Sequence, residues 1–78
     1  MFEGGVVIML DGRTIGLQLR KLRGTTSAEE VALRIGVSKS ALFMYERGER
    51  IPRDDTKVLI SQYYGVSVED LFFKQVEH

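Results

Sequence analysis

Two short helical segments joined by a glycine turn constrain the fold of this chain more than any other feature. They lie within residues 27–48, which read SAEEVALRIGVSKSALFMYERG. Ser27 predicts an N-cap for the first segment, Gly36 a left-handed turn after it, and Ser38 an N-cap for the second segment. This order of cap, helix, glycine turn, cap and helix, ended by Gly48, is typical of a helix-turn-helix.

The apolar residues of both segments fall on one side of each predicted helix. The inward faces are formed by Val31, Ala32 and Ile35 in the first segment and by Ala41, Leu42 and Tyr45 in the second. Five residues of the second segment are left facing outward, namely Lys39, Ser40, Phe43, Met44 and Arg47. The small Ala32 and the turn at Gly36 allow the two helices to cross closely.

Further caps and stop glycines predict an all-α fold, a compact five-helix bundle whose second and third helices form the helix-turn-helix. Thr14 caps the first helix, which ends before Gly24; Asp54 or Asp55 starts the fourth; and Ser67 caps the fifth. The predicted apolar faces are Ile15, Leu19 and Leu22 in the first helix and Val58, Leu59, Tyr63 and Tyr64 in the fourth. Residues 1–13 form an N-terminal extension, 14–73 the helix-turn-helix domain and 74–78 a C-terminal tail.

Composition excludes most other classes of function. The chain has 78 residues, no cysteine and one histidine, His78, so thiolate metal sites and histidine-based catalysis lack their residues. No stretch approaches the roughly 20 apolar residues of a membrane span. We therefore expect no enzyme activity, no metal, no cofactor, no small-molecule ligand and no membrane contact, and a place in the reducing cytoplasm.

The formal net charge of zero conceals a division along the chain. Residues 13–53 hold nine lysines and arginines against four acidic residues, whereas the rest holds two basic and seven acidic residues. The basic part coincides with the helix-turn-helix, as expected if this part contacts phosphates. Charged residues on solvated helix faces are the simpler alternative for many of these positions.

The run SAEEVALRIGVSKSALFMYERG, followed by IP and later by YGVSVEDLF, resembles the lambda-repressor-like helix-turn-helix family of phage Cro and repressor proteins and XRE-type regulators. The resemblance covers roughly residues 14–73. It implies five helices, a homodimer and sequence-specific binding to paired half-sites in double-stranded DNA.

The resemblance also implies roles for individual residues. Base-reading positions of the family correspond to Lys39, Ser40, Phe43 and Met44, and phosphate-contacting positions to Ser38, Arg47, Arg50 and Arg53. Phe43 and Met44 have an alternative, which is packing on the next helix or on a partner protein. Two further positions lie beside these residues. Ala28 stands where the family often has a phosphate-binding Gln, and Glu46 matches a position often engaged in an internal ion pair.

Dimerisation needs an apolar surface, and both ends of the chain offer one. Leu71, Phe72, Phe73 and Val76 are candidate interface residues, as is the run from Val6 to Leu10. Alternatively, Leu71 and Phe72 close the core of one subunit and leave only Phe73. The N-terminal run is expected to pair with its twin as a strand or to lie along the bundle.

The function predicted from these observations is that of a dimeric repressor of phage or mobile-element type that binds a palindromic operator. The alternative is a protein-interaction module (an antirepressor, antitoxin or coactivator) that uses the same fold. A separate expectation concerns Met9. The residues Glu3-Gly4-Gly5 allow codons of a ribosome-binding site, which would make Met9 the native start.

Overall fold

Side-chain caps fix where the helices begin. The computed structural model describes the backbone of residues 5–77 and the side chains of residues 6–74. The Oγ atoms of Ser27, Ser38 and Ser67 accept hydrogen bonds from backbone amides three residues further on, over 3.0–3.1 Å. All three predicted serine caps are thereby confirmed. They begin helices α2 (Ala28–Ile35), α3 (Lys39–Glu46) and α5 (Val68–Phe72).

The first helix begins earlier than predicted. Helix α1 spans Gly12–Arg23, and its N-cap is Asp11, whose Oδ1 accepts from the Thr14 amide at 2.7 Å. This hydrogen bond lowers the pKa of Asp11. The prediction of Thr14 as the cap was wrong because a carboxylate three residues earlier captures the Thr14 amide.

The turn between α2 and α3 is closed by Gly36, as predicted. Gly36 has a φ of 91°, in the left-handed region that residues with a Cβ rarely adopt. Its amide and that of Val37 both donate to the carbonyl of Ala32, at 2.8 and 3.0 Å. These bonds satisfy the end of α2 and direct the chain into α3.

Helix α4 (Asp54–Tyr64) packs with a different face from the predicted one. Val58, Leu59 and Tyr63 are 45%, 47% and 37% exposed, whereas Lys57, Ile60 and Ser61 are buried. The prediction missed the lysine, because only its aliphatic stem is apolar. Its Nζ lies 5.9 and 5.7 Å from the ring centroids of Phe72 and Phe73 and contacts Asp54 Oδ1 at 3.1 Å.

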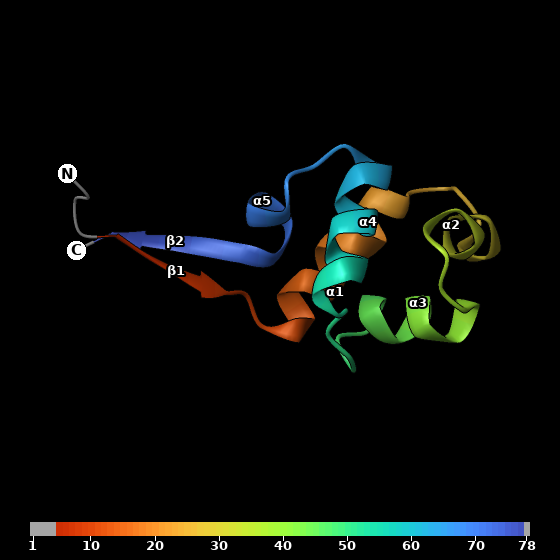
Figure 1. Ribbon diagram of the computed structural model, residues 1–78. Helices are drawn as coiled ribbons and strands as arrows, with labels where there is room; N and C mark the ends of the chain where they lie inside the picture. Colours follow the sequence, from red (N-terminus) through yellow and green to blue (C-terminus); the bar gives the residue numbers. More distant parts are fainter. Residues whose placement is uncertain (1–4, 78) are drawn as a thin grey trace.

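The core lies where all five helices meet. Its fully buried side chains come from every helix and include Ile15, Leu19, Val31, Leu42, Ile60, Leu71 and Phe72. Leu22, which was predicted to be buried in α1, is instead 38% exposed. The prediction of a five-helix bundle is confirmed. Figure 1 shows α4 crossing in front of α1, with α5 on one side of these two helices and the α2–α3 pair on the other.

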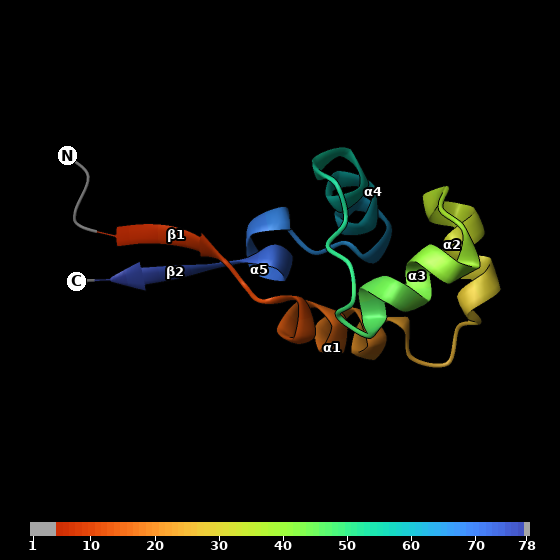
Figure 2. The same cartoon turned by 90° about the horizontal axis from the view of Figure 1, so that it is seen from below.

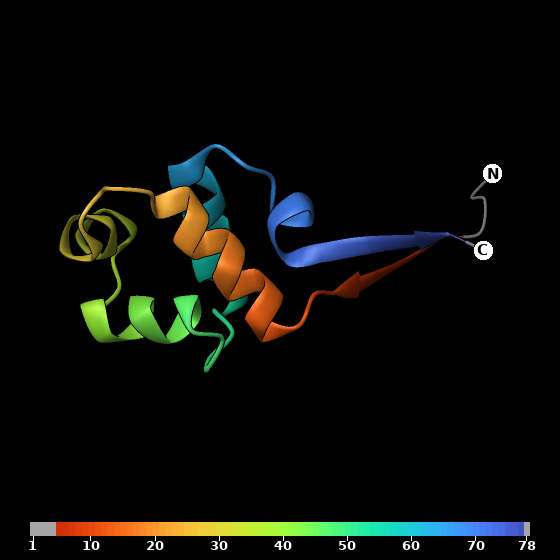
Figure 3. The same ribbon diagram turned by 180° about the vertical axis from the view of Figure 1, so that it is seen from behind.

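A two-stranded antiparallel sheet extends from the helices, and we call it the terminal ribbon. Strand β1 (Gly5–Met9) pairs with β2 (Phe73–Glu77) in a register from Gly5 opposite Glu77 to Met9 opposite Phe73. The short N-terminal strand was predicted, and its partner within one subunit is β2 of the same chain. The expectations that this strand lies along the bundle and that residues 74–78 form a C-terminal tail are corrected accordingly, whereas the pairing of the strand with its twin stays a prediction. Figures 1 and 3 show the ribbon projecting from the helices, and the molecule measures 44 × 21 × 21 Å.

Helices α1 and α3 approach so closely at Gly16 that no side chain fits there. A Cβ on Gly16 would collide with the carbonyl oxygen of Glu46 and lie 2.8 Å from that of Tyr45. The absence of a side chain at this position therefore sets the distance between α1 and α3.

We expect Gly16→Ala to lower the free energy of unfolding by about 1–3 kcal/mol, because one helix must shift to accommodate the methyl group. Thermal denaturation followed by circular dichroism measures the loss. Leu17→Ala is the matched control, since Leu17 is the next residue of α1 and is 63% exposed. Equal melting temperatures for Gly16→Ala and the wild type would contradict the close approach.

Candidate nucleic-acid interface

Helix α3 lies on the outside of the molecule. In Figure 2, which looks at the molecule from below, α3 lies in front and no other element crosses it. Lys39 and Ser40 at its start and Arg47 at its end are exposed. The side of α3 opposite the core is therefore accessible within one subunit.

The buried and exposed faces of α3 agree with the prediction, except that Phe43 and Met44 are only partly exposed. Ala41, Leu42 and Tyr45 are buried against the other helices. Met44 is partly exposed beside the exposed Ser40, one turn away on the same helix. These residues present a mixed polar and apolar surface to the solvent.

Phe43 lies between the two faces of α3. Its side chain packs against the core, and the Cζ atom of Arg23 lies 5.9 Å from its ring centroid. This arrangement is a cation–π contact, and it stabilises the ring of Phe43 on the side that faces the core. Phe43 therefore packs partly on the core, as the alternative interpretation predicted, and remains partly exposed.

The four phosphate candidates surround the ends of α3, and three of them are arginines. Ser38 is exposed, although its hydroxyl already accepts from the Ala41 amide at 3.0 Å. Arg50 and Arg53 are exposed in the loop between α3 and α4, and among the described residues neither guanidinium has an acidic partner. These two side chains are therefore open to an anionic ligand.

Arg47 differs because it has an acidic partner on the surface. Its Nε and an Nη atom donate to both carboxylate oxygens of Glu49, at 2.9 and 3.2 Å. The hydrogen bond lowers the pKa of Glu49 and raises that of Arg47. Both side chains are about half exposed, so water and salt weaken this pair.

The N-terminus of α3 is more favourable to an anion than that of α2. Helix α3 has no acidic residue in its first turn and begins with Lys39, whereas α2 begins with Glu29 and Glu30. Partial positive charge gathers at helix N-termini, and the two glutamates of α2 already neutralise it there. Ala28 stands where the family in the resemblance above often has Gln. It is 7% exposed and lies on the core side of α2.

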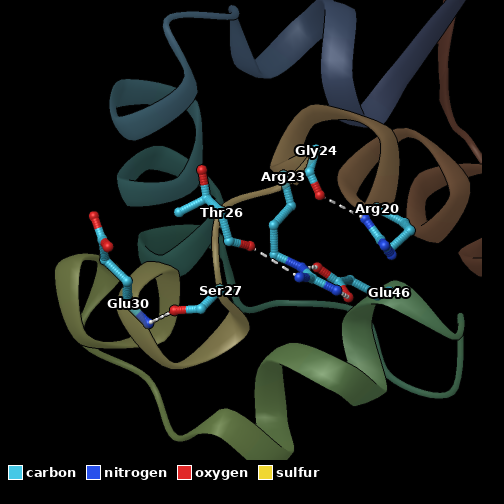
Figure 4. Close-up of polar contacts among 7 residues, drawn as sticks. All are labelled: Arg20, Arg23, Gly24, Thr26, Ser27, Glu30 and Glu46. Atoms are coloured by element: carbon cyan, nitrogen blue, oxygen red, sulfur yellow. Dashed lines mark hydrogen bonds and ion pairs between the residues drawn. The ribbon is translucent and has the colours of Figure 1, made fainter.

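A buried ion pair holds α3 against the end of α1 (Figure 4). Arg23 donates from Nε and Nη2 to the two carboxylate oxygens of Glu46, at 2.7 and 3.1 Å. Its Nη1 donates to the carbonyl of Thr26, which precedes Ser27, the N-cap of α2, at 3.0 Å. The two side chains are only 11% and 4% exposed, and the hydrogen bond with Glu46 raises the pKa of Arg23.

The sequence identified only half of this pair. Glu46 was predicted to be in an internal ion pair, but the sequence did not indicate its partner. Arg23 lies 23 positions before Glu46 in the sequence, and the two side chains meet only because α1 crosses α3. Tyr64 lies near the same ion pair. Its pKa is raised to about 12, mainly because the phenol is partly buried and also because the Glu46 carboxylate is nearby.

The fold and the position of α3 agree with the comparison with protein families. A helix-turn-helix family model matches residues 17–71, which is most of the chain. The chain belongs to the XRE-type, lambda-repressor-like helix-turn-helix family. Nothing among the curated proteins matches the sequence.

Family membership makes this chain a DNA-binding helix-turn-helix domain of a transcriptional regulator. The matched residues contain the helix-turn-helix, α4 and most of α1 and α5. The terminal ribbon lies outside the match.

The candidate dimer residues occupy different environments in this helix-turn-helix domain. Leu71 and Phe72 are 1% and 0% exposed, so they close the core of one subunit, as the alternative interpretation predicted. Phe73 is half-buried at the start of β2. The backbone of Val76 pairs with Val6, and its side chain lies outside the described ones.

Among the side chains of residues 6–74, no group of acidic side chains is placed to hold a metal ion. Nor does this part of the chain contain a helix with the length and apolar character needed to cross a membrane.

We expect Glu46→Gln to lower the free energy of unfolding by about 3–5 kcal/mol, because it leaves the buried Arg23 without its counter-charge. Denaturation by urea measures the change. The double substitution Arg23→Met with Glu46→Leu removes both charges and should recover much of the loss. If Glu46→Gln and the wild type unfold at the same urea concentration, the pair does not hold α3 in place.

Proposed function

We propose that this protein is a sequence-specific regulator that binds a palindromic operator in double-stranded DNA as a homodimer and represses transcription by occlusion. The observation that supports the proposal is the uncovered outer face of α3, with a cation at its start and arginines after its end. The major groove of B-form DNA accepts an α-helix, and its base edges are distinguishable there.

Within this proposal, the start of α3 reads bases. Lys39 is exposed and able to donate to guanine O6 and N7, while the Ser40 hydroxyl pairs with a base edge. Met44 and the exposed edge of Phe43 contact thymine methyl groups. Ser38, Arg47, Arg50 and Arg53 fix the helix to the phosphates on either side.

The second candidate function is a protein-interaction module, and a specific observation favours it. Phe43 and Met44 are apolar and partly exposed on the outer face of α3, where a partner protein could cover them. The two functions differ in their dependence on salt. Phosphate contacts release counterions, so the logarithm of a DNA-binding constant falls steeply with the logarithm of salt concentration.

Binding to random duplex DNA at several salt concentrations therefore tests the proposal. We expect steep weakening with salt and, after selection from a random duplex pool, a palindromic sequence. An absence of DNA affinity at every salt concentration would favour the interaction module.

Substitutions separate base reading from phosphate binding. We expect Lys39→Ala to reduce the preference for operator over random DNA by roughly 5- to 150-fold, the equivalent of about 1–3 kcal/mol. Arg50→Ala should weaken binding to all sequences alike and reduce the salt slope by about 1. Fluorescence anisotropy measures both effects, with Lys74→Ala in β2 as the control. An unchanged preference in Lys39→Ala would remove Lys39 from the base-reading residues.

Glu49 should limit DNA affinity because it competes with phosphate for Arg47. We expect Glu49→Gln to strengthen binding to all duplexes by up to about fivefold at low salt, in line with the strength of an exposed ion pair. Glu69→Gln removes the same charge from α5 and is the matched control. If both variants gain equally, the effect comes from net charge and not from the release of Arg47.

A further inference from the structure

The outer edge of β1 is open and apolar. Val6, Val7, Ile8 and Met9 are 45%, 51%, 48% and 44% exposed. In the sequence, β1 contains no charged residue and no proline, whereas β2 contains Lys74, Gln75 and Glu77. Natural sheets usually protect such edges with charges, proline, bulges or a covering element. None of these protects the described residues of β1 in a single subunit.

The phase of the ladder shows which backbone groups lie at this edge. Leu10 donates its amide to the carbonyl of Phe72 at 2.9 Å, in the same register that pairs Ile8 with Lys74. Hydrogen-bonded pairs alternate along an antiparallel ladder, so Ile8 and Val6 also direct their backbone groups toward β2. The amides and carbonyls of Val7 and Met9 therefore point away from β2, toward the open edge.

This edge is complementary to itself. An antiparallel pairing centred on Val7 places Val7 opposite Val7 of a second copy, Met9 opposite Gly5, and Val6 opposite Ile8. The outward backbone groups then meet outward groups, and apolar side chains meet apolar or small ones. A two-fold axis produces this arrangement, since residue i contacts j wherever j contacts i.

We propose that the protein dimerises through β1, which pairs antiparallel with β1 of a second copy and joins the two terminal ribbons into one sheet. A second copy is the fitting occupant because the strand carries no charge that would select a different partner, and because antiparallel pairing is symmetric. The inference rests on the proposed function in one respect: a palindromic operator requires two copies of α3. The ribbon projects from the end of the molecule opposite α2 and α3, so the pairing leaves the outer face of α3 open (Figure 2).

Helix α4 offers the competing surface, since Val58, Leu59 and Tyr63 are also apolar and exposed. Its backbone groups are largely satisfied within the helix, however, whereas those of Val7 and Met9 at the β1 edge have no partner strand among the described residues. Pairing at β1 therefore gains hydrogen bonds as well as apolar burial.

Sedimentation equilibrium over a range of protein concentrations tests the proposal. We expect the wild type to change from monomer to dimer as concentration rises, because a short strand pair makes a small interface. Val7→Lys should raise the dissociation constant of the dimer at least about tenfold, while Leu59→Lys, at a similarly exposed position of α4, should leave it unchanged. A wild type that stays monomeric up to roughly 1 mM, or a dimer abolished by Leu59→Lys, would overturn the proposal.

Two further measurements keep the outcome clear. Circular dichroism shows whether Val7→Lys retains its fold, and concentration-dependent protection of the Val7 and Met9 amides against hydrogen exchange reports the pairing in the unaltered protein. Absence of that protection in a dimeric wild type would also refute the pairing. Failure of the proposed function is separate: a protein that dimerises through β1 but binds no DNA retains this inference, whereas one that binds a single half-site and never dimerises loses it.

Discussion

The ion pair between Arg23 and Glu46 connects the three helices that matter most for the candidate interface. One guanidinium group at the end of α1 bonds to the end of α3 and to the carbonyl that precedes α2. A charge in such a buried position is costly unless its partners are well placed, so few arrangements of these helices satisfy it. The pair therefore selects one orientation of α3 relative to the rest of the domain. The close approach at Gly16 acts on the same contact by setting the distance between α1 and α3.

The acidic residues of the chain are distributed so that the start of α3 keeps its positive charge. Acidic residues occupy the first turns of α2, α4 and α5, where they stabilise the helix ends, and Asp11 caps α1, but α3 has no acidic residue in its first turn or at its N-cap. This leaves the positive end of α3 available beside Lys39. Since opposite charges elsewhere balance the total, the net charge of zero gives no indication of this local surface.

Local signals allowed most of the helical fold to be predicted. A serine cap or a glycine stop acts within one turn of helix, so Ser27, Ser38 and Gly36 could be assigned from their neighbours alone. Features that depend on distant residues were missed. The pairing of β1 with β2 joins opposite ends of the chain, and the buried stem of Lys57 depends on Phe72 and Phe73. At the candidate interface, the exposed face of α3 followed from helical periodicity, whereas the contact of Arg23 with Phe43 required the crossing of α1 and α3.

The register of the terminal ribbon brings Gly5 beside Glu77. A short peptide linker that joins these two positions would therefore close the polypeptide into a ring, with new ends opened in an exposed loop elsewhere. For the same reason, a bulky group attached at Gly5 or Glu77 would lie at the ribbon, far from α3 and close to the edge of β1.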